Sequence, residues 1–350
     1  MRRIHLSWNP GRAFAALSVL GALAIPAHAH AQGALTPLGI TRGPDGNVWF
    51  TEAGGNAIGR ITPSGKITTF HLPSPDRGPQ LITAGPDGNL WFVEFNVNRI
   101  GRITPSGKLT EFRAPTDLDP TITTPAAYLG GITAGPDGNI WFTEGEDNRI
   151  CRMTLSGKVT IFTLPASPDV SSDAIHNAGA IVNGPRTGPA HGALWFTDNQ
   201  AGDIGRITTD GKVKEFEVRA GADSLVGLAA GSDGNLWLSD SKANVIQMVQ
   251  PDGTIPAYGT NGKPTDFNAT SPIGVTAGPG GTMWYAAPGD NAIGRITLST
   301  SGQQVYTLPN DGSAPAFLTA GADGNIWFTE SAADAIGRIT PHGVVREFAL

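Results

Sequence analysis

A tryptophan-centred motif recurs seven times in this 350-residue chain, and its period constrains the fold more than any other feature. The copies are centred on Trp49, Trp91, Trp141, Trp195, Trp237, Trp284 and Trp327, at steps of 42 to 54 residues. In the second copy, alternating apolar residues and turn residues predict four short strands, at 81–84, 90–94, 99–104 and 108–112. Periods of this length with four strands per unit are typical of β-propellers. We therefore predict an all-β fold, a seven-bladed β-propeller with four antiparallel strands per blade.

The residues before the first copy predict a targeting segment. The chain begins with a basic segment that contains Arg2, Arg3 and Arg12. A short apolar run at 13–25 follows, and small residues suited to cleavage come after it. This pattern is typical of a secretory signal peptide, and the apolar run is too short to span a bilayer. We expect residues 1–31 to be the signal peptide and residues 32–350 to form a single propeller domain. The mature protein is then exported, either periplasmic or secreted, without a membrane span.

Charge and composition exclude several classes of function. The formal charge of −6 becomes −9 when the three leader arginines are removed, so the basic patch that nucleic-acid binding requires is not expected. The chain has 47 glycines and 27 prolines, which suit tight turns, and a single cysteine, Cys151, which cannot form an internal disulfide. It has no phosphate-binding loop, dinucleotide fingerprint or cysteine-based zinc motif. We expect a monomer stabilised by packing, with a small molecule or peptide as its partner.

Two packing features are also predicted. The last copy contains its own outer strand at 344–348, and residues 32–36 are too short to replace it, so we expect little strand exchange and blades held mainly by side-chain packing. A small residue recurs on the third strand, and we expect it to make room for the tryptophan. The positions are Gly59, Gly101, Cys151, Gly205, Gly294 and Gly337.

The repeat motifs resemble those of the virginiamycin B lyase family, also called streptogramin lyases. The resemblance rests on ITAGPDGNLWFVE (82–94), NRIGRIT (98–104) and GKLTEF (107–112), and its counterparts extend over residues 38–350. It implies a propeller that opens a cyclic depsipeptide by elimination, using a magnesium ion and a histidine base. In the family, the catalytic histidines precede the innermost strands of the last two blades, where this chain has Ile273 and Ala316. The implied metal ligands correspond to Ala314 and Glu330, so the family's elimination machinery is missing here.

An acidic residue follows the tryptophan by three positions in six copies, and we expect these residues to form a ligand-binding ring around the upper channel. They are Glu52, Glu94, Glu144, Asp198, Asp240 and Glu330. Such a ring could hold magnesium or another divalent cation through its oxygens, with Glu330 and Asp240 as the candidate ligands. The structural alternative is that recurring third-strand arginines, such as Arg60, pair with the acids. Asp240 would then lack a partner, because Met248 replaces the arginine of its copy.

Three long connections between blades supply the remaining candidates. Connections of 17 to 20 residues precede the third, fourth and sixth copies, whereas the other connections between copies have 12 residues. Long irregular loops on a rigid scaffold concentrate binding residues. We select Tyr128 and Asn177 as ligand-binding residues and His176 as the candidate base or catalytic residue, against the alternative of an ordinary loop histidine. His71, His191 and His342 are interpreted as structural or solvent-exposed.

Three functional hypotheses follow. The first is an exported propeller that binds a ligand at the acidic, loop-rich face, with the elimination reaction doubtful because the family histidines are absent. The second is a magnesium-dependent carbon–oxygen lyase or lactonase that acts on another cyclic ester or peptide. The third is a platform for interaction with another protein.

Overall fold

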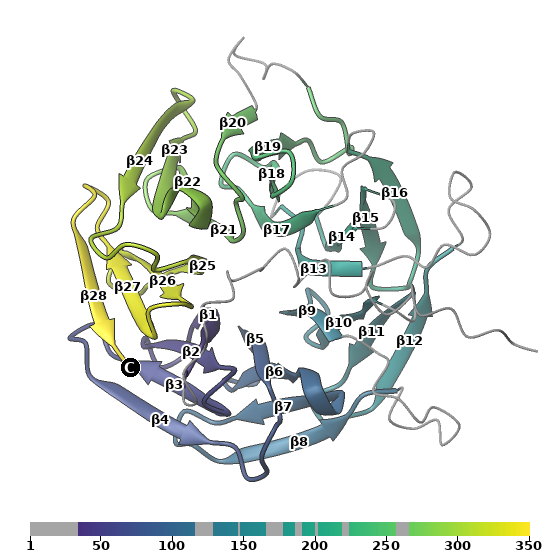
Figure 1. Ribbon diagram of the computed structural model, residues 1–350. Helices are drawn as coiled ribbons and strands as arrows, with labels where there is room; N and C mark the ends of the chain where they lie inside the picture. Colours follow the sequence, from purple (N-terminus) through teal and green to yellow (C-terminus); the bar gives the residue numbers. More distant parts are fainter. Residues whose placement is uncertain are drawn as a thin grey trace, which may run out of the picture.

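The computed structural model describes residues 34–115, 129–145, 148–165, 178–185, 191–199, 202–218, 224–256 and 266–350. Its strands form seven four-stranded antiparallel sheets, each made from strands that are consecutive in the chain. Figure 1 shows these sheets as blades around a common centre, with the first strand of each blade innermost and the fourth at the rim. The predicted seven-bladed β-propeller is confirmed. The expected signal peptide at 1–31 lies outside the described residues.

The strands are short and evenly distributed. Blades one to three comprise β1 (Pro37–Arg42), β2 (Val48–Glu52), β3 (Ala57–Ile61), β4 (Ile67–His71); β5 (Pro79–Ala84), β6 (Leu90–Glu94), β7 (Arg99–Ile103), β8 (Leu109–Arg113); and β9 (Leu129–Ala134), β10 (Ile140–Glu144), β11 (Arg149–Met153), β12 (Val159–Thr163). Blades four and five comprise β13 (Ala178–Asn183), β14 (Ala193–Asp198), β15 (Asp203–Thr208), β16 (Val213–Glu217); and β17 (Leu225–Ala230), β18 (Leu236–Asp240), β19 (Val245–Val249), β20 (Asp266–Asn268). Blades six and seven comprise β21 (Val275–Gly278), β22 (Thr282–Ala287), β23 (Ala292–Thr297), β24 (Gly302–Thr307); and β25 (Pro315–Ala320), β26 (Ile326–Glu330), β27 (Ala335–Ile339), β28 (Val345–Ala349).

Helix is nearly absent from the described residues. Two single-turn 3₁₀ helices, η2 (Phe95–Val97) and η5 (Pro288–Asp290), connect the second and third strands of blades two and six. In the described part of the chain, none of the helical segments has the length and apolar character that crossing a membrane would require.

The tryptophan of each repeat anchors one face of its blade. Trp49 is fully buried and stacks on Phe70 of the outer strand at 5.4 Å between ring centroids. The Arg60 guanidinium lies over both rings, 5.4 and 5.5 Å from their centroids. The indole N–H donates a hydrogen bond of 3.0 Å to Asp45, which lies in the turn between β1 and β2. The recurring turn and tryptophan therefore act as one packing unit.

The small residues on the third strands make room for a different aromatic residue from the one expected. A Cβ atom added to Gly59 would lie 2.1 Å from the ring of Phe50, not against Trp49. Gly101 and Gly337 face Phe92 and Phe328 in the same way. Side chains alternate along a strand, so the residue after the tryptophan packs on the opposite face of the blade. The prediction that these glycines accommodate the tryptophan is wrong.

A β-bulge interrupts the innermost strand of six blades. In the first blade the pairing skips from Pro37–Glu52 to Ile40–Phe50, so two residues face Thr51. The Thr51 hydroxyl accepts a hydrogen bond of 2.9 Å from the backbone N–H of Gly39 and donates one to a backbone carbonyl of the next blade. The same two-sided bridge recurs at Thr143, Ser239 and Thr329. These hydroxyls therefore link the inner strands of neighbouring blades.

A left-handed residue before the third strand fixes the connection between blades. Asn56 has a φ of 50°, and its side-chain amide donates to the Ser74 carbonyl at 2.8 Å and accepts from the Arg77 backbone N–H at 2.9 Å. Asparagine, aspartate and glycine tolerate this conformation best. The equivalent positions are Asn98, Asn148, Gly202, Asn244, Asn291 and Asp334. Sequence analysis overlooked this position, although Asn, Asp or Gly recurs there.

The ring closes without exchange of a strand, as predicted, because the seventh sheet contains only β25 to β28. Figure 1 shows the C-terminus beside the first blade. Closure uses directed hydrogen bonds as well as packing. They are Thr329 hydroxyl to Leu38 carbonyl (2.9 Å), Leu35 and Thr36 N–H to the Asp334 carboxylate (3.0 and 2.8 Å), and Arg338 to the Pro63 carbonyl (2.8 Å). A buried cluster that includes Phe50, Trp327 and Phe348 fills the same junction.

Removing the closing hydroxyl should weaken the whole ring. Thr329→Val keeps the volume of the side chain but leaves the Phe317 N–H and the Leu38 carbonyl without their buried partner. We expect a loss of about 1–3 kcal/mol in the free energy of unfolding, measured by chemical denaturation. Thr307→Val, on the exposed part of β24, is the matched control and should change it by less than about 0.5 kcal/mol. Equal effects of the two substitutions would contradict the closing role of Thr329.

Candidate functional site

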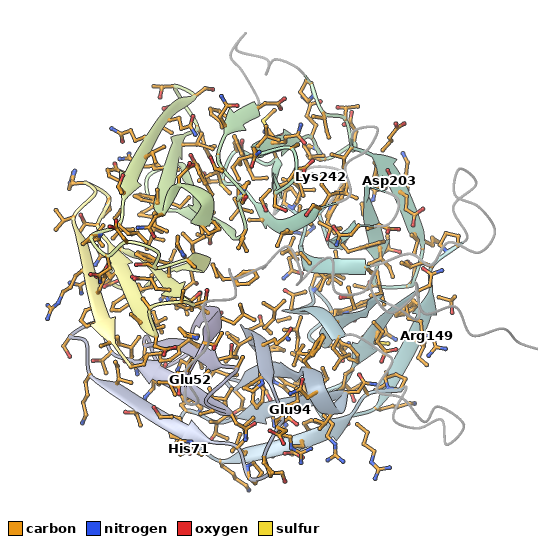
Figure 2. All side chains as sticks on the ribbon, in the orientation of Figure 1. Glu52, His71, Glu94, Arg149, Asp203 and Lys242 are labelled. Atoms are coloured by element: carbon orange, nitrogen blue, oxygen red, sulfur yellow. The ribbon has the colours of Figure 1, made fainter. Side chains whose placement is uncertain are left out.

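The six acidic residues occupy equivalent places in their blades. Each ends its second strand opposite the first residue of the innermost strand, as in the pairs Glu52–Pro37 and Glu330–Pro315. Their exposed fractions are at most 2%. Figure 2 shows Glu52 and Glu94 within their blades, away from the centre of the disc. The structure therefore brings the six acids to one end of the propeller but buries each of them within its blade, and their role in ligand binding stays a prediction.

The recurring arginines do not pair with these acids. Arg60 lies opposite Trp49, on the other face of the blade from Glu52. Its guanidinium lies 3.9 Å from Asp45 and donates a hydrogen bond of 2.9 Å to the Pro105 carbonyl in the next blade. Four other blades repeat the carbonyl contact, through Arg102, Arg152, Arg295 and Arg338. The suggested pairing of acids with arginines is wrong, because strand alternation separates the two sets.

Asp240 is held by backbone groups. Its carboxylate accepts hydrogen bonds from the backbone N–H groups of Lys242 (3.2 Å) and Ala243 (2.9 Å) in the turn after β18. The expectation that Met248 leaves this acid without a partner is therefore wrong. Turn formation, not an ion pair, explains an aspartate at this position.

Glu94 belongs to a charged network at the end of the second blade. The Arg77 guanidinium lies 3.7 Å from Glu94 and 3.0 Å from Glu111, and Arg99 also lies 3.0 Å from Glu111. Burial, with the neighbouring Glu111, raises the pKa of Glu94 to about 7, although Arg77 and Arg99 oppose the shift. In the first blade, burial likewise raises the pKa of Glu52, against the Thr69 hydrogen bond and the charge of His71.

Glu330 is buried without comparable support. Among the described residues no arginine or lysine forms an ion pair with it, its hydrogen-bonding neighbour is the Ser313 side chain, and its carboxylate neighbour, Glu347, receives a hydrogen bond from the Asn310 amide. Burial, followed by the charge of Glu347, raises the pKa of Glu330 to about 7, and the Ser313 side chain opposes the shift. Glu330 and Glu94 are thus the two of the six acids whose pKa is raised to about 7.

The central channel contains an apolar cavity of about 190 Å³. Its wall includes one aliphatic residue from each blade: Ile40, Ile82, Ile132, Ile181, Leu228, Val275 and Leu318. The six acids are not among the residues that line it. Leu81, Ala180 and Phe317 also line the cavity, at a position where most blades have glycine. Sequence analysis overlooked this position, and its variation among otherwise regular repeats was the available signal.

The positions of the family histidines contain buried apolar side chains. Ile273 is 5% exposed and Ala316 is fully buried. Their backbone carbonyls are used in contacts between blades, because the Ile273 carbonyl accepts from Ser239 and the Ala316 carbonyl accepts from the Gly274 N–H. Ala314, at the implied metal-ligand position, has a φ of 49°. These three side chains offer neither a base nor a metal ligand.

The loop candidates Tyr128, His176 and Asn177 lie outside the described residues, so their roles stay predictions. The other histidines that were selected as structural or exposed, His71, His191 and His342, are all exposed. Figure 2 shows His71 near Glu52 at the rim side of the first blade.

The described residues do not fit a magnesium site. Magnesium requires several oxygen ligands in octahedral geometry. Glu330 and Asp240 end strands in different blades, and Asp240 already accepts two backbone hydrogen bonds. Within the described ranges, no group of three or more His, Cys, Asp or Glu side chains is arranged to hold a metal ion.

The protonation of Glu330 should make stability depend on pH. Its pKa in the folded protein is about 7, above the ordinary 4.5, so the folded state binds more protons between these values and stability falls as pH rises from 4.5 to 7. We expect Glu330→Gln to flatten this slope and to raise the free energy of unfolding at pH 8 by roughly 1–3 kcal/mol. Denaturant titrations from pH 4.5 to 8 would measure it, with Glu217→Gln on the exposed end of β16 as the control. An unchanged pH profile in Glu330→Gln would refute the assignment.

Comparisons with known proteins agree with the fold and with the repeat motifs. The model of the virginiamycin B lyase family matches residues 25–263 and 259–350. Curated virginiamycin B lyases from Bordetella pertussis and Bordetella parapertussis are 50% identical over 44 residues, which is 13% of this chain and only 15% of the length of these relatives.

Solved structures match over most of the chain. A streptogramin B lyase is 31% identical, covers 90% of this chain and 94% of its own, and has a TM-score of 0.73. Virginiamycin B lyase from Staphylococcus aureus is 35% identical, with 87% and 94% covered and a TM-score of 0.71. A catalytically inactive histidine-to-alanine variant of that enzyme, with quinupristin, is 34% identical, with 88% and 96% covered and a TM-score of 0.72. The chain belongs to the virginiamycin B lyase family.

Proposed function

We propose that this protein is an exported, ligand-binding member of the family that does not open streptogramin rings. Its ligand, a small molecule or peptide, binds at the end of the channel where the inner strands begin and the long connections enter. The observation that carries the proposal is the pair of buried apolar side chains, Ile273 and Ala316, at the positions where the family resemblance implies catalytic histidines. The propeller fold shared with the family supports ligand binding, whereas isoleucine and alanine at these two positions do not support the family's elimination reaction.

Elimination requires chemical groups that the two family histidine positions of this chain lack. Elimination beside an ester carbonyl requires a base that removes a weakly acidic carbon-bound proton. It also requires a cation or donor that stabilises the negative charge on the enolate oxygen. In the inactive Staphylococcus aureus variant one histidine is replaced by alanine. This chain has alanine or isoleucine at both histidine positions, and such side chains cannot accept a proton.

Glu330 does not replace the missing base by itself. Its pKa of about 7 suits proton transfer, but the carboxyl group is fully buried beside Glu347 and does not line the central cavity. A substrate placed over the channel would need this group to become accessible.

A working metal-dependent lyase or lactonase is the second candidate. The observation that favours it is the identity of 31 to 35% to solved lyases over about nine-tenths of the chain. In this hypothesis His176 supplies the base from the connection before the fourth blade, and the substrate is a different cyclic ester or peptide. The platform hypothesis has weaker support, because the exposed large apolar side chains in the described ranges, Ile161, Val305 and Val344, lie in different blades.

Ring opening provides the direct test. We expect the purified protein to linearise a streptogramin B antibiotic no faster than buffer, with the Staphylococcus aureus enzyme as the positive control. Loss of a general base alone typically lowers a rate by about 10² to 10⁴. Chromatography of the cyclic and linear forms would measure the rate. Magnesium-dependent opening that His176→Ala abolishes would overturn the proposal in favour of the second candidate.

Metal binding is tested separately. We expect no tight stoichiometric uptake of magnesium, calcium or manganese by chelator-treated protein in calorimetric titrations, because the described residues lack a suitable set of oxygen ligands. Tight binding that Glu330→Gln abolishes would show that Glu330 serves as a ligand. Tight binding that survives this substitution would place a metal site elsewhere in the chain.

A further inference from the structure

The cavity in the channel lies next to the face proposed for ligand binding. Its lining comes mainly from the second to fourth residues of the innermost strands, such as Gly130–Ile132 in β9 and Val226–Leu228 in β17. These strands begin at the end where the connections between blades enter. The cavity therefore lies nearer to the end of the channel that a ligand on this face would reach first.

Side chains make the wall apolar. The ring of seven aliphatic residues is 3 to 9% exposed, which leaves only the edge of each side chain at the wall. Leu81, Ala180 and Phe317 are half-buried and line the cavity at the position where the other blades have glycine. Among the described residues that line the cavity, Gln80 alone has a polar side chain, and none is charged.

The backbone at this level is also largely satisfied. Inner-strand bulges would ordinarily leave N–H and C=O groups available to a ligand or to water. Here the N–H groups of Gly39, Gly131, Ala180, Gly227 and Phe317 donate to threonine or serine hydroxyls of their own blades. The Gly274 N–H donates directly to the Ala316 carbonyl of the next blade. The bridging hydroxyls thus remove hydrogen-bonding capacity from the channel wall.

Volume limits what the cavity can accept. An apolar cavity of roughly 150 Å³ holds one benzene molecule. The 190 Å³ of this cavity therefore suits one six-membered ring or one branched aliphatic group, and not a whole peptide or antibiotic. A charged group would lose its hydration without gaining a partner.

We propose that the central channel is a socket for one neutral apolar group of single-ring size, carried by the ligand that binds over the loop-rich face. This inference rests on the proposed function for the rest of the ligand, but the socket can be tested without it. It identifies the ligand class as molecules that present an uncharged aromatic or branched aliphatic substituent, such as a peptide with a phenylalanine or leucine side chain.

The test uses small probes with the full-length mature protein. We expect benzene to bind at least tenfold more tightly than benzoate or benzylammonium, which have the same ring but a charge, as measured by NMR titration. Ala180→Phe should fill the cavity and weaken benzene binding at least tenfold. Ala322→Phe, in the exposed turn between β25 and β26 on the opposite face, is the matched control and should bind like the wild type.

A second variant tests the size of the socket. Phe317→Ala should enlarge the cavity and increase the affinity for naphthalene at least tenfold, while the wild type binds it poorly. This comparison decides the question if Ala180→Phe does not fold. Failure of the wild type to bind benzene, equal binding of benzene and benzoate, or full benzene binding by a folded Ala180→Phe variant would overturn the socket. Those outcomes leave the proposed function standing, whereas streptogramin opening would overturn the function and leave the socket.

Discussion

Each blade has two apolar faces, and both must be covered by neighbours. The tryptophan face of one blade meets the phenylalanine face of the next, as in the clusters that join Trp49 to Phe92 and Trp327 to Phe50. A single repeat cannot bury these faces alone, so the ring must close. The closing junction uses the same side-chain types as the internal junctions, with Thr329 bridging to Leu38 as Thr51 bridges to the second blade. Closure therefore extends the repeat and needs no exchanged strand.

The same geometry explains why the acids are buried. Glu52, Glu94, Asp198 and Glu330 lie on the phenylalanine face, two residues beyond a phenylalanine whose ring packs on a third-strand glycine. In the seventh blade, a Cβ atom on Gly337 would lie 2.6 Å from Glu330 Oε1. Where a second glutamate faces that glycine from the outer strand, as Glu347 does, the two carboxyl groups come together. A raised pKa is the consequence of this packing, and it is not by itself evidence of catalysis.

Features that repeat in every blade were predictable, whereas the environment of a side chain required knowledge of neighbouring blades. The strand and turn pattern predicted the second blade to within about two residues at each boundary, because turn residues and alternation act locally. Alternation could also have shown that Arg60 and Glu52 lie on opposite faces. The burial of Glu52 could not be deduced in this way, because it depends on how the residues around Asp334 and Leu35 fit together at the closing junction. The loop candidates lie outside the repeated strands and turns, so the repeat pattern carries no information on their surroundings.

Fold and chemistry are separable in this architecture for a physical reason. At the two family histidine positions, the backbone carbonyls hold the blades together, and any side chain leaves that contact in place. Replacing histidine by Ile273 or Ala316 therefore removes a base without removing a structural bond. The apolar replacements also extend the apolar surface near the channel, since both residues are buried beside the cavity wall formed by Gly274 and Phe317. In the function proposed here, loss of the elimination reaction would thus leave the ring intact, and an apolar channel would suit an uncharged group better than the developing charge of an enolate.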